Sequence, residues 1–199
     1  MPKGSGWYVC VLGPVEVYSS GGELCRFRTR KTGLLIALLA LRAEPRLRRD
    51  TLAELLWPES TPEAARQSLR MALMDARRVT SPEFLITDRD SVALQPDSFS
   101  LDLHDFQRTQ GAGTIAALSS IRGPALEGQE GDIVVSERSR IHNMIAQLAV
   151  ESCRAAPSQE AIETLKRLLT LVGFREDLYV AMMRAFIDLG SMSAALATF

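Results

Sequence analysis

The chain has 199 residues, of which 46% are hydrophobic and 24% are charged, a composition typical of a globular protein with one large or two modest domains. Its longest apolar stretch, Leu34 to Leu41, is far shorter than the roughly 20 residues that a membrane helix needs. Residues Met1 to Gly6 lack the apolar core of a signal peptide and are expected to form a flexible leader. We therefore expect a cytoplasmic protein with no membrane contact.

The chain contains few of the residues that most often bind metals, form disulfides or act in catalysis. Cys10, Cys25 and Cys153 are odd in number and widely spaced, which favours buried thiols over a disulfide framework or a zinc site. Two histidines, His104 and His142, have no cysteine close by, and the chain has no glycine-rich phosphate loop with a lysine. The sequence thus predicts neither an enzyme nor a metal or cofactor site. Two further carboxylates, Asp102 and Asp105, are expected to cap a helix or lie on the surface.

The net charge of −1 hides an asymmetry along the chain. Residues 26–80 contain 12 Lys or Arg against 6 Asp or Glu, whereas residues 101–199 contain 9 basic and 12 acidic residues. A basic segment in a nearly neutral chain suggests that one module faces a polyanion and the other does not.

The first 30 residues have the pattern of short strands. Trp7 to Leu12 is rich in β-branched and aromatic residues, and Val15 to Tyr18 alternates after the turn signal Gly13-Pro14. Leu24 to Arg28 alternates apolar and basic residues and predicts a third strand. Together they predict a small antiparallel sheet.

The pattern then changes to a helical period. Apolar spacing predicts helices over residues 31–42, 49–57 and 62–79, the last with Thr61 as its cap and Pro62 in its first position. Residues 84–87 and 91–94 flank a polar tetrad and predict a hairpin. Residues 1–98 are therefore expected to form an α+β winged helix-turn-helix domain with an extra N-terminal antiparallel sheet.

Residues 99–199 predict an all-α domain. Its helices are expected to break at Gly111-Ala112-Gly113, at residues 123–131, at Ala156-Pro157, and at Gly173 and Gly190. Ala161 and Ala195 lie 34 residues apart, which is the period of tetratricopeptide helix pairs. Because a new helix has barely begun at Phe199, we expect this domain to be truncated there.

The third predicted helix is the most informative element. Placing side chains at about 100° intervals separates a core face of small and apolar residues, Ala65, Leu69, Ala72, Leu73 and Ala76. The opposite face carries Gln67, Arg70, Met71, Met74 and Arg78, with Arg66 and Arg77 along one edge. Such a face suits a helix in the major groove, although an amphipathic helix with a solvated basic face has the same pattern. The neighbouring helix and hairpin favour DNA binding.

Other basic residues are candidates for phosphate contacts. Arg48 and Arg49 begin the second helix, where backbone amides often bind an anion. The sheet edge and the start of the first helix supply Arg28, Arg30 and Lys31. Arg89 at the hairpin tip is a candidate for minor-groove insertion, although Asp88 and Asp90 beside it would repel phosphates. Ordinary surface charge is nearly as good an interpretation for each of them.

One specific pattern in the chain is Leu55-Leu56-Trp57-Pro58 followed by Ala65-Arg66 and Leu69-Arg70. This pattern resembles the Streptomyces antibiotic regulatory protein (SARP) family of transcriptional regulators. Residues 102–106, 123–128 and 161–179 resemble that family's bacterial transcriptional activation domain.

The resemblance implies an activator that binds direct repeats of double-stranded promoter DNA as a side-by-side homodimer and contacts RNA polymerase. It implies that Arg66, Arg70, Arg77 and Arg78 occupy recognition-helix positions and that Arg49 is a typical second-helix arginine. Arg48 departs from the family pattern, because a serine or threonine cap is usual there. Two alternatives stay open, namely a protein-interaction scaffold and the regulatory front of a larger signalling ATPase or cyclase.

Overall fold

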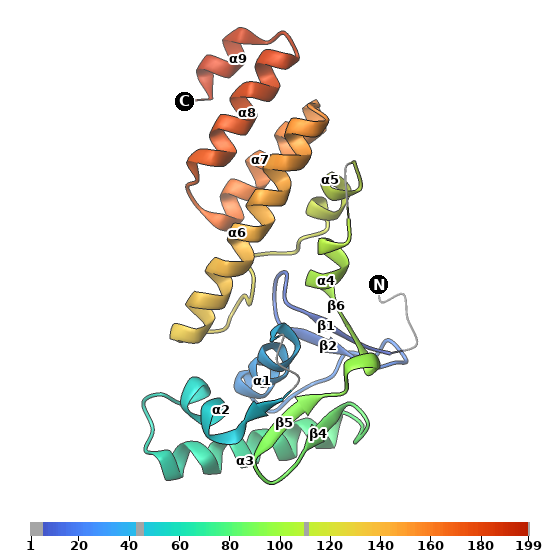
Figure 1. The fold of residues 1–199 in the computed structure, drawn as a ribbon, viewed down its shortest axis with the longest axis vertical. Coiled ribbons are helices and arrows are strands. Elements are labelled where there is room, and N and C mark those ends of the chain that lie inside the picture. The colour runs from blue at the N-terminus through green and yellow to red at the C-terminus, as the bar shows by residue number, and fades with distance from the viewer. Residues whose placement is uncertain (1–5, 43–45, 110–111, 199) are drawn as a thin grey trace. The chain divides into compact units, whose positions relative to one another are not determined.

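The computed structural model describes residues 6–42, 46–109 and 112–198. Most of the leader and Phe199 thus lie outside the described residues (Figure 1). The strands are β1 (Trp7–Cys10), β2 (Glu16–Tyr18), β3 (Leu47–Arg48), β4 (Leu85–Thr87), β5 (Ser91–Leu94) and β6 (Phe99–Leu101). The helices are α1 (Arg30–Leu41), α2 (Arg49–Leu56), α3 (Pro62–Val79), α4 (Asp102–Gln107), α5 (Ala112–Ser119), α6 (Asp132–Ala155), α7 (Gln159–Val172), α8 (Glu176–Asp188) and α9 (Met192–Ala197).

The chain divides into two compact units. Unit 1 contains the residues through His104 together with Leu126–Val135, and unit 2 contains Asp105–Ala125 and the residues from Ser136 onward. The mixed α+β class expected from the sequence is therefore present, with the strands in unit 1 and helices dominating unit 2.

The first sheet of unit 1 has the strand order β2-β1-β6. β1 pairs antiparallel with β2, so that Val9 lies opposite Val17, and pairs parallel with β6, so that Val9 lies opposite Leu101. The expected purely antiparallel sheet is thus wrong, because its third strand comes from a distant segment and runs parallel. The strand expected over Leu24 to Arg28 is also wrong, since only Leu24 bridges to Tyr18 before the chain leaves the sheet.

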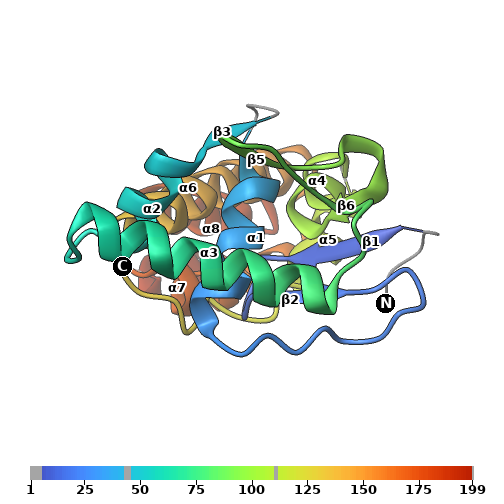
Figure 2. The same ribbon diagram turned by 90° about the horizontal axis from the view of Figure 1, so that it is seen from below.

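A second sheet, β3-β5-β4, is antiparallel and contains the predicted hairpin. The three predicted helices of this region are confirmed to within one residue at each end by α1, α2 and α3. In α1, all nine residues from Thr32 to Ala40 are buried, because α2, α3, β1 and β5 pack around it. Figure 2 shows α3 running across α1 and α2. α1 is therefore the centre of this core, and α3 lies at its surface.

Two connections close unit 1 after the hairpin. The Asp102 carboxylate accepts hydrogen bonds from the amides of Val11, at 2.9 and 3.0 Å, and Leu12, at 3.0 Å. Further along the chain, the amides of Leu126 and Glu127 donate to the carbonyls of Val11 and Gly13, both at 3.0 Å. The end of β1 is thus held by two segments that follow it by about 90 and 115 residues.

Unit 2 contains helices that pack in chain order, α7 against α8 and α8 against α9, with α5 against α7. The expected breaks at Ala156-Pro157, Gly173 and Gly190 are confirmed, and both glycines have positive φ, near 80° and 75°. The break expected at Gly111-Ala112-Gly113 is wrong for its last two residues, which begin α5, and Gly111 lies outside the described residues. Among the described residues, no helix is both long and apolar enough to cross a membrane.

The three cysteines are free thiols in the structure. Cys10 and Cys153 are buried, as the sequence predicts. Cys25 is only half-buried, so the expectation of three buried thiols is wrong for this residue. The cause is the missing third strand, because Cys25 lies in the irregular segment that leaves the sheet edge.

Candidate nucleic-acid interface

Helix α3 begins and ends as its sequence predicts. The Thr61 hydroxyl accepts a hydrogen bond from the Ala64 amide at 3.3 Å, and Pro62 occupies the first position. Glu63 lies in the first turn and Arg77 and Arg78 in the last, so side-chain charges oppose the helix dipole at both ends. These local signals fix the length of the helix independently of what it binds.

The two predicted faces of α3 are confirmed. All five residues expected in the core are buried, with exposures of 5% or less. The seven residues expected outward are exposed: Arg66, Gln67, Arg70, Met71, Met74, Arg77 and Arg78. Met74 is 59% exposed and Met71 is 50% exposed, so the outer face combines cationic and apolar side chains. The outer face of α3 has two flanks, which differ in how their charges are held.

The first flank faces the start of α2 and the β4–β5 hairpin. It encloses a cavity of about 230 Å³ whose lining includes five arginines, Arg48, Arg49, Arg66, Arg70 and Arg89. The Arg66 guanidinium donates to Asp50 at 2.8 Å, and this exposed ion pair lowers the pKa of Asp50. Arg48 precedes α2 and makes no side-chain cap, as expected from its identity. The flank therefore concentrates cations beside a helix start.

The hairpin tip is organised by Asp88 rather than left as a loose acidic loop. The Asp88 carboxylate accepts from the Ser91 hydroxyl and amide and from the Asp90 amide, which lower its pKa to about 2, and Arg46 lies 2.7 Å away. Arg49 donates to the Asp88 carbonyl at 3.0 Å. The charge of Asp88 is thus largely engaged, while Arg89 next to it is exposed.

The second flank faces the start of α1. Here a groove of about 500 Å³ separates α3 from the residues that lead into α1. Three cationic side chains line it, Arg28, Lys31 and Arg78, together with Trp57, Met71 and Met74. This flank is consequently more apolar than the first.

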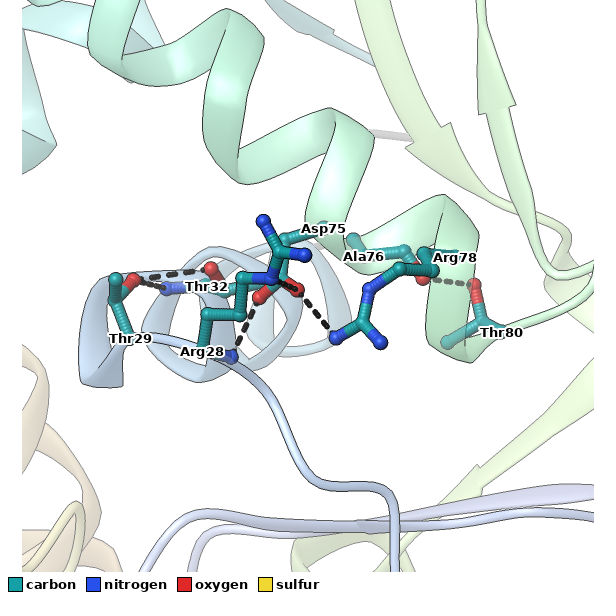
Figure 3. Close-up of polar contacts among 7 residues, drawn as sticks. All are labelled: Arg28, Thr29, Thr32, Asp75, Ala76, Arg78 and Thr80. Atoms are coloured by element: carbon teal, nitrogen blue, oxygen red, sulfur yellow. Dashed lines mark hydrogen bonds and ion pairs between the residues drawn. The ribbon is translucent and has the colours of Figure 1, made fainter.

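Asp75 lies in the wall of this groove, and its role was not anticipated from the sequence. Its side chain is only 6% exposed, and its carboxylate accepts from the Arg28 amide at 2.7 Å and from the Arg78 guanidinium at 2.9 Å (Figure 3). Burial by itself raises the pKa of Asp75, but hydrogen bonds from Arg78, the Arg28 amide and Thr32 outweigh it and lower the pKa. One signal in the sequence could have found it, namely an acidic residue adjacent to the core position Ala76.

The structure brings most of the candidate residues to one of the two flanks. The first flank holds Arg48, Arg49, Arg66, Arg70 and Arg89, and the second holds Arg28, Lys31, Gln67, Met74 and Arg78. Two candidates lie at neither flank. Arg30 donates to the Gly128 carbonyl at 3.3 Å, and Arg77 lines a separate pocket with Pro82 and residues 85–87.

The structure also shows what two further carboxylates, Asp102 and Asp105, contact. Within residues 6–42, 46–109 and 112–198, no group of three or more His, Cys, Asp or Glu side chains is placed to hold a metal ion. The carboxylate of Asp102 instead caps backbone amides, and Asp105 forms an exposed pair with Arg108 at 3.7 Å.

The chain is similar to known proteins in both its sequence and its fold. Residues 101–199 match the family model of the bacterial transcriptional activator domain. The transcriptional regulatory protein MoaR1, from both Mycobacterium bovis and Mycobacterium tuberculosis, is 25% identical over 94% of this chain and 68% of its own length. Mycobacterium tuberculosis EmbR, solved in complex with a low-affinity phosphopeptide, shares the fold with a TM-score of 0.65 and 22% identity over 96% of this chain.

The fold and these relatives define a transcriptional regulator. More particularly, the chain is similar to SARP-type transcriptional regulators, and residues 101–199 match a bacterial transcriptional activator domain. This chain covers 57% of the length of the EmbR chain. The rest of EmbR has no matching residues in this chain.

Proposed function

We propose that this chain is a cytoplasmic, sequence-specific activator that binds double-stranded promoter DNA through a winged helix-turn-helix domain. In this proposal, α2 and α3 form the helix-turn-helix, α3 enters the major groove, and the β4–β5 hairpin is the wing. In this proposal the DNA-binding domain is residues 1–98, to whose sheet β6 adds a strand, and the tetratricopeptide-like activation domain within residues 99–199 contacts RNA polymerase. A homodimer occupies adjacent direct repeats.

One observation carries the proposal, namely the outer face of α3 with an arginine-rich flank on one side. An arginine on an exposed helix face can bond two acceptors of a guanine edge, and Arg70 has this position. Arg48 and Arg49 at the start of α2 and Arg89 at the hairpin tip supply positive charge beside it, where phosphates would lie. A scaffold without DNA binding would not need this concentration of cations.

The proposal is tested by selecting duplexes from a randomised double-stranded library with the wild-type chain. Binding of the selected duplex and of a shuffled duplex is then measured over a salt series. For Arg70→Ala we expect about a tenfold loss in affinity for the selected duplex and a smaller loss for the shuffled one. For Arg48→Ala we expect similar losses for both duplexes and a salt slope smaller by about 1.

A matched control is Arg154→Ala, which removes an exposed arginine from α6 in unit 2. This variant should bind both duplexes as the wild type does. Failure of the wild-type chain to enrich any duplex, or equal losses in all three variants, would contradict the proposal.

A further inference from the structure

Asp75 is an unusual residue for a helix that faces nucleic acid. α3 contains two acidic residues, and Glu63 lies in the first turn, where it favours the helix dipole. Asp75 instead lies near the other end, beside Arg78 and within the wall of the groove. A carboxylate there repels phosphates, so its presence calls for a different role.

The contacts of Asp75 connect two segments that are distant in sequence. It accepts the backbone amide of Arg28, which is 47 residues earlier, and this bond holds the lead-in to α1 against α3. It also accepts the Arg78 guanidinium, while Arg28 Nε lies 3.9 Å from the same carboxylate oxygen. Figure 3 shows both arginine side chains turned toward Asp75 from different elements.

Arg28 and Arg78 can still contact a ligand although Asp75 holds them. The side chain of Arg78 is 53% exposed and that of Arg28 is 69% exposed, so each presents part of its guanidinium to solvent while Asp75 is buried beneath. An arginine side chain is long and flexible, and it loses rotamer entropy when it is immobilised. Because Asp75 already restricts the arginine side chain in the free protein, less side-chain entropy is lost when DNA binds.

We propose that Asp75 is a positioning residue of the DNA-reading surface, which holds Arg78 and the Arg28 segment in one fixed arrangement and so supports sequence discrimination. The inference rests on the proposed DNA-binding function. A base contact requires a guanidinium in one place, whereas a phosphate contact tolerates many positions. Loss of Asp75 would therefore weaken discrimination while strengthening general attraction to DNA.

Asp75→Asn separates the two tasks of this residue. The asparagine side-chain oxygen can still accept the Arg28 amide, but the side chain no longer carries the charge that holds Arg78. The selected and shuffled duplexes described above serve as probes over a salt series. We expect the ratio of their affinities to fall about tenfold in Asp75→Asn. Binding to the shuffled duplex should strengthen at low salt, with a salt slope steeper by about 1.

Two further variants give the test its specificity. Asp97→Asn makes the same change of charge at an exposed site of unit 1 and should leave the affinity ratio unchanged. In an Arg78→Ala background, Asp75→Asn should no longer change the affinity ratio, because the side chain that it positions is absent. A purely structural role would instead lower the ratio by the same factor with and without Arg78.

Thermal unfolding of each variant shows whether it is folded. The DNA affinities of all variants are then compared at a temperature well below their unfolding transitions. An unchanged affinity ratio in folded Asp75→Asn, beside a wild type that enriches a duplex, overturns the positioning role alone. Failure of the wild type to enrich any duplex overturns both this inference and the proposed function.

Discussion

In each unit a titratable side chain of a helix accepts a backbone amide from a loop. The side chain is charged in unit 1 and neutral in unit 2. In unit 1, the ionised carboxylate of Asp75 accepts the Arg28 amide. In unit 2, the His142 ring in α6 accepts the Ala125 amide through Nε2 at 3.1 Å, so the ring must be neutral there. Arg138 completes this second contact by donating to the Ala125 carbonyl at 2.8 Å. The same task therefore needs a charge in one unit and the absence of a charge in the other.

This difference determines how each unit responds to acid. Burial lowers the pKa of His142, and the nearby Arg138 and Arg175 lower it further. The pKa of Asp75 is also lowered, by its hydrogen bonds against the effect of burial. Both groups thus stabilise the fold above their unfolded pKa and lose this contribution as the pH falls, but the loss begins near pH 6.5 for histidine and near pH 4 for aspartate. Unit 2 should therefore weaken first on acidification.

The largest effect is expected from removing a carboxylate that holds buried backbone in unit 1. Asp102→Ala leaves the amides of Val11 and Leu12, both in buried residues, without their acceptor and should lower the free energy of unfolding by about 3 kcal/mol. Urea unfolding followed by tryptophan fluorescence measures unit 1, because Trp7 and Trp57 are the chain's two tryptophans and both belong to it.

Exposed Asp105 supplies the control for this measurement, since its pair with Arg108 lies on the surface. Asp105→Ala should leave the tryptophan transition in place. An unchanged transition in Asp102→Ala as well would show that this carboxylate does not hold β1.

A smaller effect is expected when the imidazole of unit 2 is titrated. Between about pH 7.5 and about pH 5.5, the wild-type unit 2 should lose stability by less than about 1.4 kcal/mol per pH unit, which is the limit for one proton. His142→Gln should reduce this dependence, because a glutamine oxygen can accept the Ala125 amide without titrating. Far-UV circular dichroism during urea unfolding follows the helices of both units, and the tryptophan transition of unit 1, measured in parallel, identifies the part that belongs to unit 2.

The exposed His104 provides a comparison from unit 1, and His104→Gln should leave the pH dependence of unit 2 at its wild-type value. If His142→Gln keeps the wild-type dependence, the contrast between the two units is wrong.

The smallest effect is expected at an exposed pair that holds no backbone. Asp50→Ala should not shift the tryptophan transition measurably, because both Asp50 and Arg66 lie at the surface. It should increase DNA affinity at low salt, since Arg66 is then free to contact phosphate. A clear loss of stability would instead place this pair among the contacts that hold unit 1 together.

Much of unit 1 could be predicted because its signals are local. Thr61, Pro62 and the apolar spacing of α3 define that helix, and the alternating residues around Asp88–Ser91 define the hairpin. The outward positions of Arg70 and Arg78 followed from helical periodicity alone. The roles of these residues in DNA binding remain predictions.

Other features depended on partners that lie far away along the chain. Leu24 to Arg28 has the alternation of a strand, yet only Leu24 bridges to Tyr18 at the outer edge of β2, and the third strand of the sheet is β6, about 90 residues after β1. The two residues of β3 are too few to give a periodic signal, and they pair only because β5 lies beside them. Strand pairing is a long-range choice that local pattern does not encode.

Local signals specify where α3 begins, where it ends and which of its side chains face outward, because caps and periodicity act within a few residues. By contrast, the contact of Asp75 with the Arg28 segment, and with it the arrangement that holds Arg78, arises from long-range packing. A buried carboxylate needs donors, and here they came partly from a segment 47 residues away that the fold alone brings into contact.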